Sequence, residues 1–126
     1  MTRRGACRPH FLIAVDELLD IFSTTVGSKV AGPLLARIAS RGREAGLHHI
    51  AGAQRPSVSG IGGLLKANFP ARLVGRVGSP EDARVAAGVG GTRAETLAGR
   101  GDFMAAGGGQ LTRFRAALAP KEWPAL

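Results

Sequence analysis

Hydrophobic residues are concentrated in two short segments in the first half of the chain. Residues 11–15 read FLIAV, a continuous apolar run, and residues 47–53 read LHHIAGA, a short segment of mainly apolar and small residues that includes two histidines. Apolar runs without alternation are typical of strands buried on both faces, as in parallel α/β sheets. We therefore predict two buried strands. Residues 54–57 leave the second strand as a loop, because Pro56 cannot continue a central strand.

The segment between these runs has the spacing of a helix. Apolar residues recur at i, i+4 and i+8 as Val30, Leu34 and Ile38. This pattern predicts a helix over residues 28–43 with one apolar face. Gly46 follows at a position suited to ending that helix.

The second half of the chain predicts a strand, a helix and a hairpin. Residues 72–77 form a strand candidate. Residues 79–82 read SPED, which supplies a Ser cap, a Pro at the first helical position and two acids in the first turn. Residues 88–91 are rich in glycine and stop this helix. Two β-like runs, 102–106 and 110–117, flank three glycines and predict a β-hairpin. The whole order is that of an α/β fold.

Composition adds a charge argument. The 126 residues suffice for one small domain with a modest core. Seventeen Lys and Arg against nine Asp and Glu give a net charge of +8. This excess favours a polyanionic partner, since Arg contacts phosphate bidentately and is always charged. A high-GC genome, which enriches Arg, Gly and Ala together, is the alternative explanation.

Other compositional features bear on the cellular compartment of the protein. Cys7 is the only cysteine, which excludes an intramolecular disulfide and a cysteine metal cluster. No stretch approaches the roughly 20 apolar residues of a membrane helix. We expect a cytoplasmic protein, with any membrane association arising through segments outside this chain.

Two carboxylates follow the first apolar run directly. In P-loop ATPases, an acid at the carboxyl end of such a strand helps to hold the magnesium of bound nucleotide, and the next acid orients or deprotonates the attacking water. Asp16 and Glu17 fit this arrangement. Their like charges repel unless a cation lies between them. The alternative is an acidic helix N-terminus in which Asp16 caps the helix and Glu17 faces water.

An amide lies at the exit of the second predicted strand. Gln54 can therefore lie beside Asp16 at the same edge of the sheet, where a side-chain amide can sense the γ-phosphate or position water. A plain polar strand end is the alternative.

Five segments in a fixed order carry a resemblance to a known family. They are residues 13–17 (IAVDE), 35–39 with 43–48 (LARIA, REAGLH), 54–57 (QRPS), 65–72 (LKANFPAR) and 99–104 (GRGDFM). In order and spacing they resemble the motor domain of FtsK/SpoIIIE DNA translocases from the Walker B strand onward.

The resemblance implies an α/β, RecA-like P-loop NTPase half-domain with a mainly parallel sheet, flanking helices and a C-terminal β-hairpin. This partial motor domain would span residues 11–118, between a basic segment over residues 1–10 and a C-terminal tail over residues 119–126.

The family consists of hexameric, ATP-driven motors that move double-stranded DNA through a central channel in chromosome segregation and cell division. By resemblance, Asp16 and Glu17 are the Walker B acids, with Asp16 on Mg²⁺, and Gln54 is the sensor-like amide. Arg43 matches the position that supplies an arginine finger to the nucleotide of the neighbouring subunit. Arg41 is the rival for that role.

The resemblance also implies DNA contacts. Lys66 and Arg84 match channel-facing positions that contact the DNA backbone, and Arg55 is expected to contribute from a neighbouring loop. Phosphate contacts carry no sequence information, which suits a motor that steps along any DNA. The alternative for each is an ordinary exposed cation, and for Arg55 also an internal ion pair.

The sequence departs from the family in several respects. No GxxxxGK followed by Ser or Thr occurs, so the β- and γ-phosphates lack their cradle. We expect ATP and Mg²⁺ to bind in the complete motor and not to this chain alone. Locally, His49 replaces an aliphatic residue, Ala53 a threonine, and Pro80 a basic residue of the second DNA loop.

Two other functions remain open. One is a conjugative or plasmid-transfer DNA pump of the same superfamily. The other is a DNA-binding or ring-modulating fragment that does not hydrolyse ATP.

Overall fold

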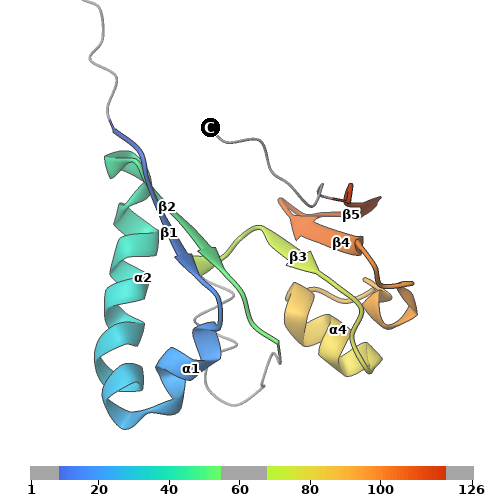
Figure 1. Cartoon of the computed structure of the whole chain (residues 1–126), viewed down its shortest axis with the longest axis horizontal. Coiled ribbons are helices and arrows are strands. Elements are labelled where there is room, and N and C mark those ends of the chain that lie inside the picture. Colours follow the sequence, from blue (N-terminus) through green and yellow to red (C-terminus); the bar gives the residue numbers. More distant parts are fainter. Residues whose placement is uncertain (1–8, 55–67, 119–126) are drawn as a thin grey trace, which may run out of the picture. The chain divides into compact units, whose positions relative to one another are not determined.

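The computed structural model describes residues 9–54 and 68–118 (Figure 1). The chain folds as two compact units: the N-terminal unit holds the first described range, and the C-terminal unit holds residues 69–118. Two predicted DNA-contacting residues, Arg55 and Lys66, lie outside the described residues.

The N-terminal unit contains a parallel pair of strands. β1 (Phe11–Val15) and β2 (Leu47–Ala51) run side by side in a register that places Phe11 beside Leu47 and Val15 beside Ala51. The two apolar runs therefore form strands as predicted. Because the pair is parallel and in step, both carboxyl ends lie at the same edge.

A series of helical segments connects these strands. The short helix α1 (Leu18–Ser23) comes directly after β1, where the sequence analysis considered a helix only as the alternative for the two acids. The predicted helix over residues 28–43 is found as a π-helical turn (Gly27–Ala31) followed by α2 (Gly32–Arg41), with Pro33 in the first turn of α2. Among the helices of the described ranges, none has the length and apolarity that a bilayer crossing needs.

Gly46 ends this helical connection, as predicted. A 3₁₀ turn (Arg43–Ala45) precedes it, and Gly46 itself has a φ of 78°. Its carbonyl oxygen accepts a hydrogen bond from the Phe11 N–H at 2.9 Å. A Cβ here would lie 2.8 Å from the carbonyl oxygen of Pro9, so both conformation and space require glycine.

The strand pair is covered on one face. Ile13 and Val15 are partly buried, whereas Leu12 and Ile50 are 63% and 60% exposed on the opposite face. The predicted burial on both faces is therefore not found within residues 9–54. The helices of the N-terminal unit supply only one layer, and no other element of that range covers the second face.

The C-terminal unit is built on an antiparallel sheet. β3 (Arg72–Val74), β4 (Asp102–Gly107) and β5 (Gln110–Arg115) pair in the order β3-β4-β5, with β4 antiparallel to both neighbours. A parallel arrangement, predicted for most of the sheet, is confined to β1 and β2 among the described strands. For β4 and β5 the reason is the hairpin, since a two-residue turn can join only antiparallel strands.

The hairpin itself is confirmed. Gly108 and Gly109 form the turn with φ values of 57° and 77°, the pair of positive angles that a type I′ turn requires. On the flanking strands, Phe103 and Phe114 are directly opposite each other and stack with ring centroids 5.8 Å apart. Cross-strand aromatic pairs of this kind help to fix the register of a sheet.

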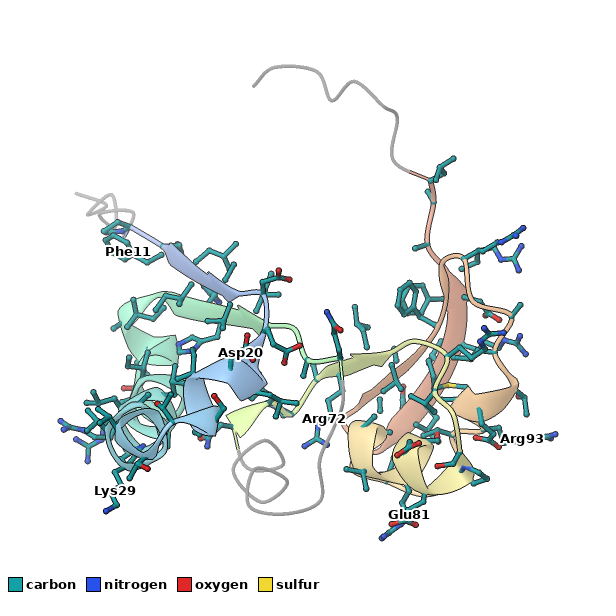
Figure 2. All side chains as sticks on the ribbon, turned by 60° about the horizontal axis from the view of Figure 1, so that its bottom comes forward. Phe11, Asp20, Lys29, Arg72, Glu81 and Arg93 are labelled. Carbon is teal, nitrogen blue, oxygen red and sulfur yellow. The ribbon has the colours of Figure 1, made fainter. Side chains whose placement is uncertain are left out.

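Small residues dominate the core of the C-terminal unit. The buried apolar residues are Val74, Ala83, Ala87, Ala94, Leu97 and Ala106. Ala83 and Ala87 belong to α4 (Pro80–Ala87), and their short side chains let this helix approach the sheet closely. Arg72 reaches the last turn of α4, where its Nη1 donates to the Ala86 carbonyl oxygen at 3.3 Å, and burial lowers the pKa of Arg72 (Figure 2).

A buried carboxylate ties β4 to β5. Asp102 is 4% exposed and receives two hydrogen bonds from Arg113, from Nε to Oδ1 at 3.0 Å and from Nη2 to Oδ2 at 2.7 Å. Its Oδ2 also accepts from the backbone N–H of Ala98 at 2.8 Å. These hydrogen bonds, the one from Arg113 foremost, lower the pKa of Asp102 from 3.8 to about 2.

We predict that Asp102 makes the fold sensitive to acid. Because its folded pKa is depressed, its stabilisation is complete above about pH 4 and is lost as the pH falls from there toward about 2. Asp102→Asn should lower the melting temperature at neutral pH by several degrees and flatten the fall of stability in this window. Circular dichroism melts against pH measure both effects. Asp20→Asn, which removes an exposed carboxylate of α1, is the matched control, and equal effects of the two variants would contradict the assignment.

Candidate functional site

The exits of β1 and β2 are tied together by backbone hydrogen bonds. The N–H of Gly52 donates to the carbonyl oxygen of Val15 at 2.8 Å, and the N–H of Leu18 donates to that of Gly52 at 2.9 Å. A Cβ on Gly52 would clash with the carbonyl oxygen of Asp16, so only glycine fits. Sequence reasoning assigned Gly52 no separate role, although a glycine two residues before a polar strand exit was a usable signal.

The Glu17 carboxylate bridges the two strand exits. It is the N-cap of α1, where Oε1 accepts from the Leu19 N–H at 3.1 Å. Its second oxygen, Oε2, accepts from the backbone N–H of Gln54 at 3.0 Å. The two N–H groups fix the direction of the carboxylate, because each of its oxygens is held by a different backbone donor. A carboxylate has about four lone-pair positions, so each oxygen can still accept another proton donor.

Asp16 has the opposite environment. It is exposed, and no hydrogen bond or ion pair engages its side chain among residues 9–54 and 68–118. The alternative in which Asp16 caps the helix and Glu17 faces water is therefore wrong, because Glu17 caps the helix and Asp16 is the exposed acid. An unpaired carboxylate beside a strand exit suits a cation that takes its other ligands from phosphate and water.

Magnesium fits this donor set without a complete protein cage. In the described part of the chain, no group of three or more His, Cys, Asp or Glu can hold a metal ion. Mg²⁺ in nucleotide sites is usually bound through one or two carboxylates together with phosphates and waters. Asp16 is a carboxylate of the kind that such a site needs.

Gln54 lies at the same sheet edge as the two acids. Its backbone is held by Glu17, while its exposed side-chain amide makes no hydrogen bond within the described residues. The structure thus brings together Asp16, Glu17 and Gln54, three residues that the sequence analysis singled out. A free amide beside two carboxylates can donate to an anionic group or to a water.

The two finger candidates lie at the other end of the strands. Arg41 is exposed in the last turn of α2, and the backbone of Arg43 begins the 3₁₀ turn that leads to Gly46 and the amino end of β1. Asp16 follows the carboxyl end of that five-residue strand. At about 3.3 Å per residue, roughly 16 Å of strand separates the two positions.

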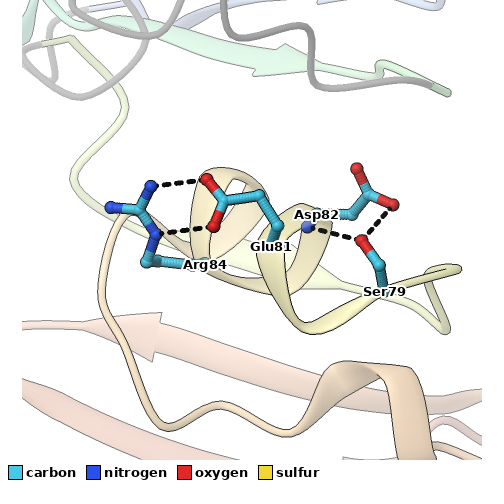
Figure 3. A network of polar contacts seen from close by, with 4 residues as sticks. All are labelled: Ser79, Glu81, Asp82 and Arg84. Atoms are coloured by element: carbon cyan, nitrogen blue, oxygen red, sulfur yellow. Dashed lines mark hydrogen bonds and ion pairs between the residues drawn. The ribbon is translucent and has the colours of Figure 1, made fainter.

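Arg84 belongs to the C-terminal unit. It lies on α4, is exposed, and forms an ion pair with Glu81 three residues earlier (Figure 3). Sequence reasoning missed this pair, although the i, i+3 spacing of Glu and Arg on a helix was a usable signal. Pro80, one of the departures from the family pattern, is the first residue of this helix.

His49, another departure, lies in the middle of β2 beside Ile13. Its Nε2 is buried and has no hydrogen-bond partner among residues 9–54 and 68–118. An unsatisfied buried nitrogen is unfavourable, so this histidine is less suited to the strand than an aliphatic residue.

Comparison with known proteins identifies relatives named DNA translocase FtsK. No protein-family model matches the chain. The chain is 41% identical over 116 residues to the DNA translocase FtsK of Helicobacter pylori, which covers 90% of the chain and 13% of that protein. It is 42% identical over 106 residues to the DNA translocase FtsK of Caulobacter vibrioides, covering 83% and 12%. The chain therefore spans about an eighth of the length of these relatives.

Two solved structures share the fold. The pCW3 conjugation coupling protein TcpA, determined with ATPγS, has a TM-score of 0.76 and 24% identity over 88% of this chain and 33% of its own. The cytoplasmic domain of the Type VII secretion ATPase EccC from Thermomonospora curvata has a TM-score of 0.72 and 28% identity over 86% of this chain and 12% of its own. These likenesses confirm the predicted RecA-like P-loop NTPase fold.

Proposed function

The chain belongs to the FtsK/SpoIIIE family of DNA translocases, and from this premise we propose that it forms part of a motor that hydrolyses ATP to move double-stranded DNA. The observation that carries the proposal is the arrangement at the carboxyl ends of β1 and β2. There the Glu17 carboxylate is fixed by two backbone N–H groups beside an unpaired Asp16 and the amide of Gln54.

Each of these residues has a separate role in the proposed reaction. Asp16 would supply a protein ligand to Mg²⁺, and the bound ion would neutralise charge on the β- and γ-phosphates of the nucleotide. Glu17 accepts a proton from, or orients, the attacking water through the lone pairs that its two backbone donors leave free. Gln54 donates from its side-chain amide to the γ-phosphate or to that water.

Nucleotide binding is proposed for the complete motor. The 126 residues contain no glycine-rich phosphate loop with its Lys and Ser or Thr, and without that loop few donors face the phosphates. ATP and Mg²⁺ are thus the proposed ligands of a motor that also contains this loop.

We place the finger role on Arg43 and the assembly in a ring, as the family resemblance implies. The position of the 3₁₀ turn at the amino ends of the strands, away from Asp16, supports action on the nucleotide of a neighbouring subunit. A homo-oligomeric ring, with a hexamer as the expected size, provides that neighbour.

Chromosome segregation during cell division is the favoured process. Relatives at 41% and 42% identity carry the name FtsK, whereas the likeness to the conjugation coupling protein, at 24% identity, bears on the fold alone.

DNA binding by the chain itself tests the proposed partner. We propose that Lys66, Arg84 and Arg55 contact the phosphate backbone. Lys66→Ala combined with Arg84→Ala should weaken binding to unrelated duplexes equally and reduce the slope of log affinity against log salt by about two. The reason is that each phosphate contact releases about one counterion when it forms, and the variant forms two contacts fewer. Fluorescence anisotropy over a series of salt concentrations measures both quantities.

The matched control for this experiment is Lys29→Ala combined with Arg37→Ala, which removes two exposed cations from the N-terminal unit. The control should retain most of the salt dependence. Selective loss on one sequence contradicts a backbone grip, and equal loss in the control attributes the binding to overall charge, in line with the compositional explanation.

A further inference from the structure

The two acids in the first turn of α4 have different partners (Figure 3). Ser79 caps the helix: its Oγ accepts from the Asp82 N–H at 3.1 Å and donates to Asp82 Oδ2 at 2.7 Å. Asp82 is therefore engaged at the start of the helix. Glu81 instead points to Arg84, one turn further along.

The contact between Glu81 and Arg84 is bidentate. Arg84 Nη2 lies 2.5 Å from Glu81 Oε1, and its Nε lies 3.3 Å from Oε2. The hydrogen bonds, and then the charge attraction, lower the pKa of Glu81 and raise that of Arg84. Both side chains are well exposed, at 61% and 59%, so water and salt reach the pair.

A carboxylate in this position competes with phosphate. Arg binds carboxylates and phosphates through the same planar fork of N–H donors, and Glu81 occupies two of those donors on Arg84. Because an exposed ion pair is weak, a phosphate can displace the carboxylate, but the displacement reduces the net affinity.

We propose that Glu81 sets the affinity of Arg84 for the DNA backbone by holding its guanidinium in the unbound chain. The inference rests on the proposed function, which makes Arg84 a phosphate contact. In this proposal Glu81 weakens the contact between Arg84 and phosphate equally on every DNA sequence. The reason is that the guanidinium recognises only the charge and the paired oxygens of its partner, and these are the same for every phosphate. A weak contact is suited to a motor that must release each phosphate to advance.

A double-mutant cycle on the 126-residue chain tests the proposal. Glu81→Gln should raise the affinity for short duplexes of unrelated sequence by about two- to fivefold at low salt, the effect expected from an exposed pair. The gain should shrink as salt is added, since screening weakens the competing ion pair. In the Arg84→Ala background the same substitution should give no gain, because Glu81 then has no guanidinium to hold.

The control is Glu44→Gln, which removes one negative charge from an exposed position in the N-terminal unit. A similar gain from this control, or an equal gain from Glu81→Gln in both backgrounds, attributes the effect to net charge and overturns the proposal. If the unsubstituted chain binds DNA and Glu81→Gln binds it with the same affinity, the role of Glu81 is overturned while the proposed function stands.

A second measurement is independent of DNA. In an NMR titration of the free chain, Arg84→Ala should raise the pKa of the Glu81 carboxylate toward its ordinary value. An unchanged pKa means that the pair does not form in solution and overturns the proposal. If the pair forms but neither the chain nor Glu81→Gln binds any duplex, the proposed function fails, and the role of Glu81 on DNA fails with it.

Discussion

Glu17→Gln should lower the rate of ATP hydrolysis of a complete motor by about 10²–10⁴-fold, the usual contribution of a general base, while nucleotide still binds. The background for this test is a chimaera in which the upstream part of the motor from the Helicobacter pylori relative is joined to this chain. Gln keeps the size of the side chain but removes the negative charge that accepts the proton from water. Steady-state hydrolysis with DNA present, and titration with a non-hydrolysable nucleotide, separate the rate from the binding.

The structure adds a second consequence to this substitution. Both oxygens of Glu17 accept from backbone N–H groups, those of Leu19 and Gln54. In Gln, one oxygen becomes an NH₂ group, which places a donor against a donor at one of these two positions. Glu17→Gln should therefore also lower the melting temperature of the chain. Asp20→Asn, an exposed carboxylate on α1, is the control and should change neither hydrolysis nor melting to a comparable degree.

Hydrolysis within a few-fold of the unsubstituted chimaera would falsify the role of Glu17 as the base. If binding is lost together with hydrolysis, the result instead points to a structural role for the bridge between the strand exits.

Arg43→Ala should remove most of the hydrolysis of the same chimaera, by about 10³-fold or more, because a planar and permanently charged finger stabilises the phosphoryl-transfer transition state. Nucleotide affinity should change little. The turn that contains Arg43 lies at the amino ends of the strands, about 16 Å of strand away from Asp16. This separation favours action on a neighbouring nucleotide.

Rings assembled from two different variants test whether Arg43 acts on the nucleotide of the neighbouring subunit. A subunit with Arg43→Ala keeps its own Glu17, and a subunit with Glu17→Gln keeps its own Arg43. When the two are mixed, some interfaces combine an intact Glu17 with an intact Arg43 from the neighbour, and partial hydrolysis should return. Mixtures that stay inactive while each variant still assembles contradict action in trans. Arg41→Ala is the matched control, and a larger loss there would move the finger role to Arg41 at the end of α2.

Elements fixed by neighbouring residues were predictable from the sequence. The two-glycine turn between β4 and β5 follows from the positive φ values that glycine adopts without strain. The start of α4 follows from Ser79 and Pro80, whose capping and φ preference act within one turn. The apolar run of residues 11–15 likewise sufficed for a strand, because no polar residue interrupts it.

The pairing of strands was less predictable. The family resemblance implied a mainly parallel sheet, whereas β4 lies between β3 and β5 and is antiparallel to both. Alternation and propensity describe each strand by itself, and the direction of its neighbour depends on how the connection folds back. The bidentate contact of Asp102 with Arg113 depends on that pairing, because it joins residues on adjacent strands.

The same division applies to the candidate site. The sequence alone placed Asp16, Glu17 and Gln54 at strand exits, since the two acids come directly after residues 11–15 and Gln54 comes directly after the second predicted strand. Which acid is held and which is free was decided by tertiary structure. Glu17 is bound by the N–H of Gln54, 37 residues away, and this contact exists only because Gly52 lets the exit of β2 pass close to the backbone of Asp16. Local sequence determines which chemical groups reach an edge, whereas long-range packing determines which of their lone pairs remain available for a ligand.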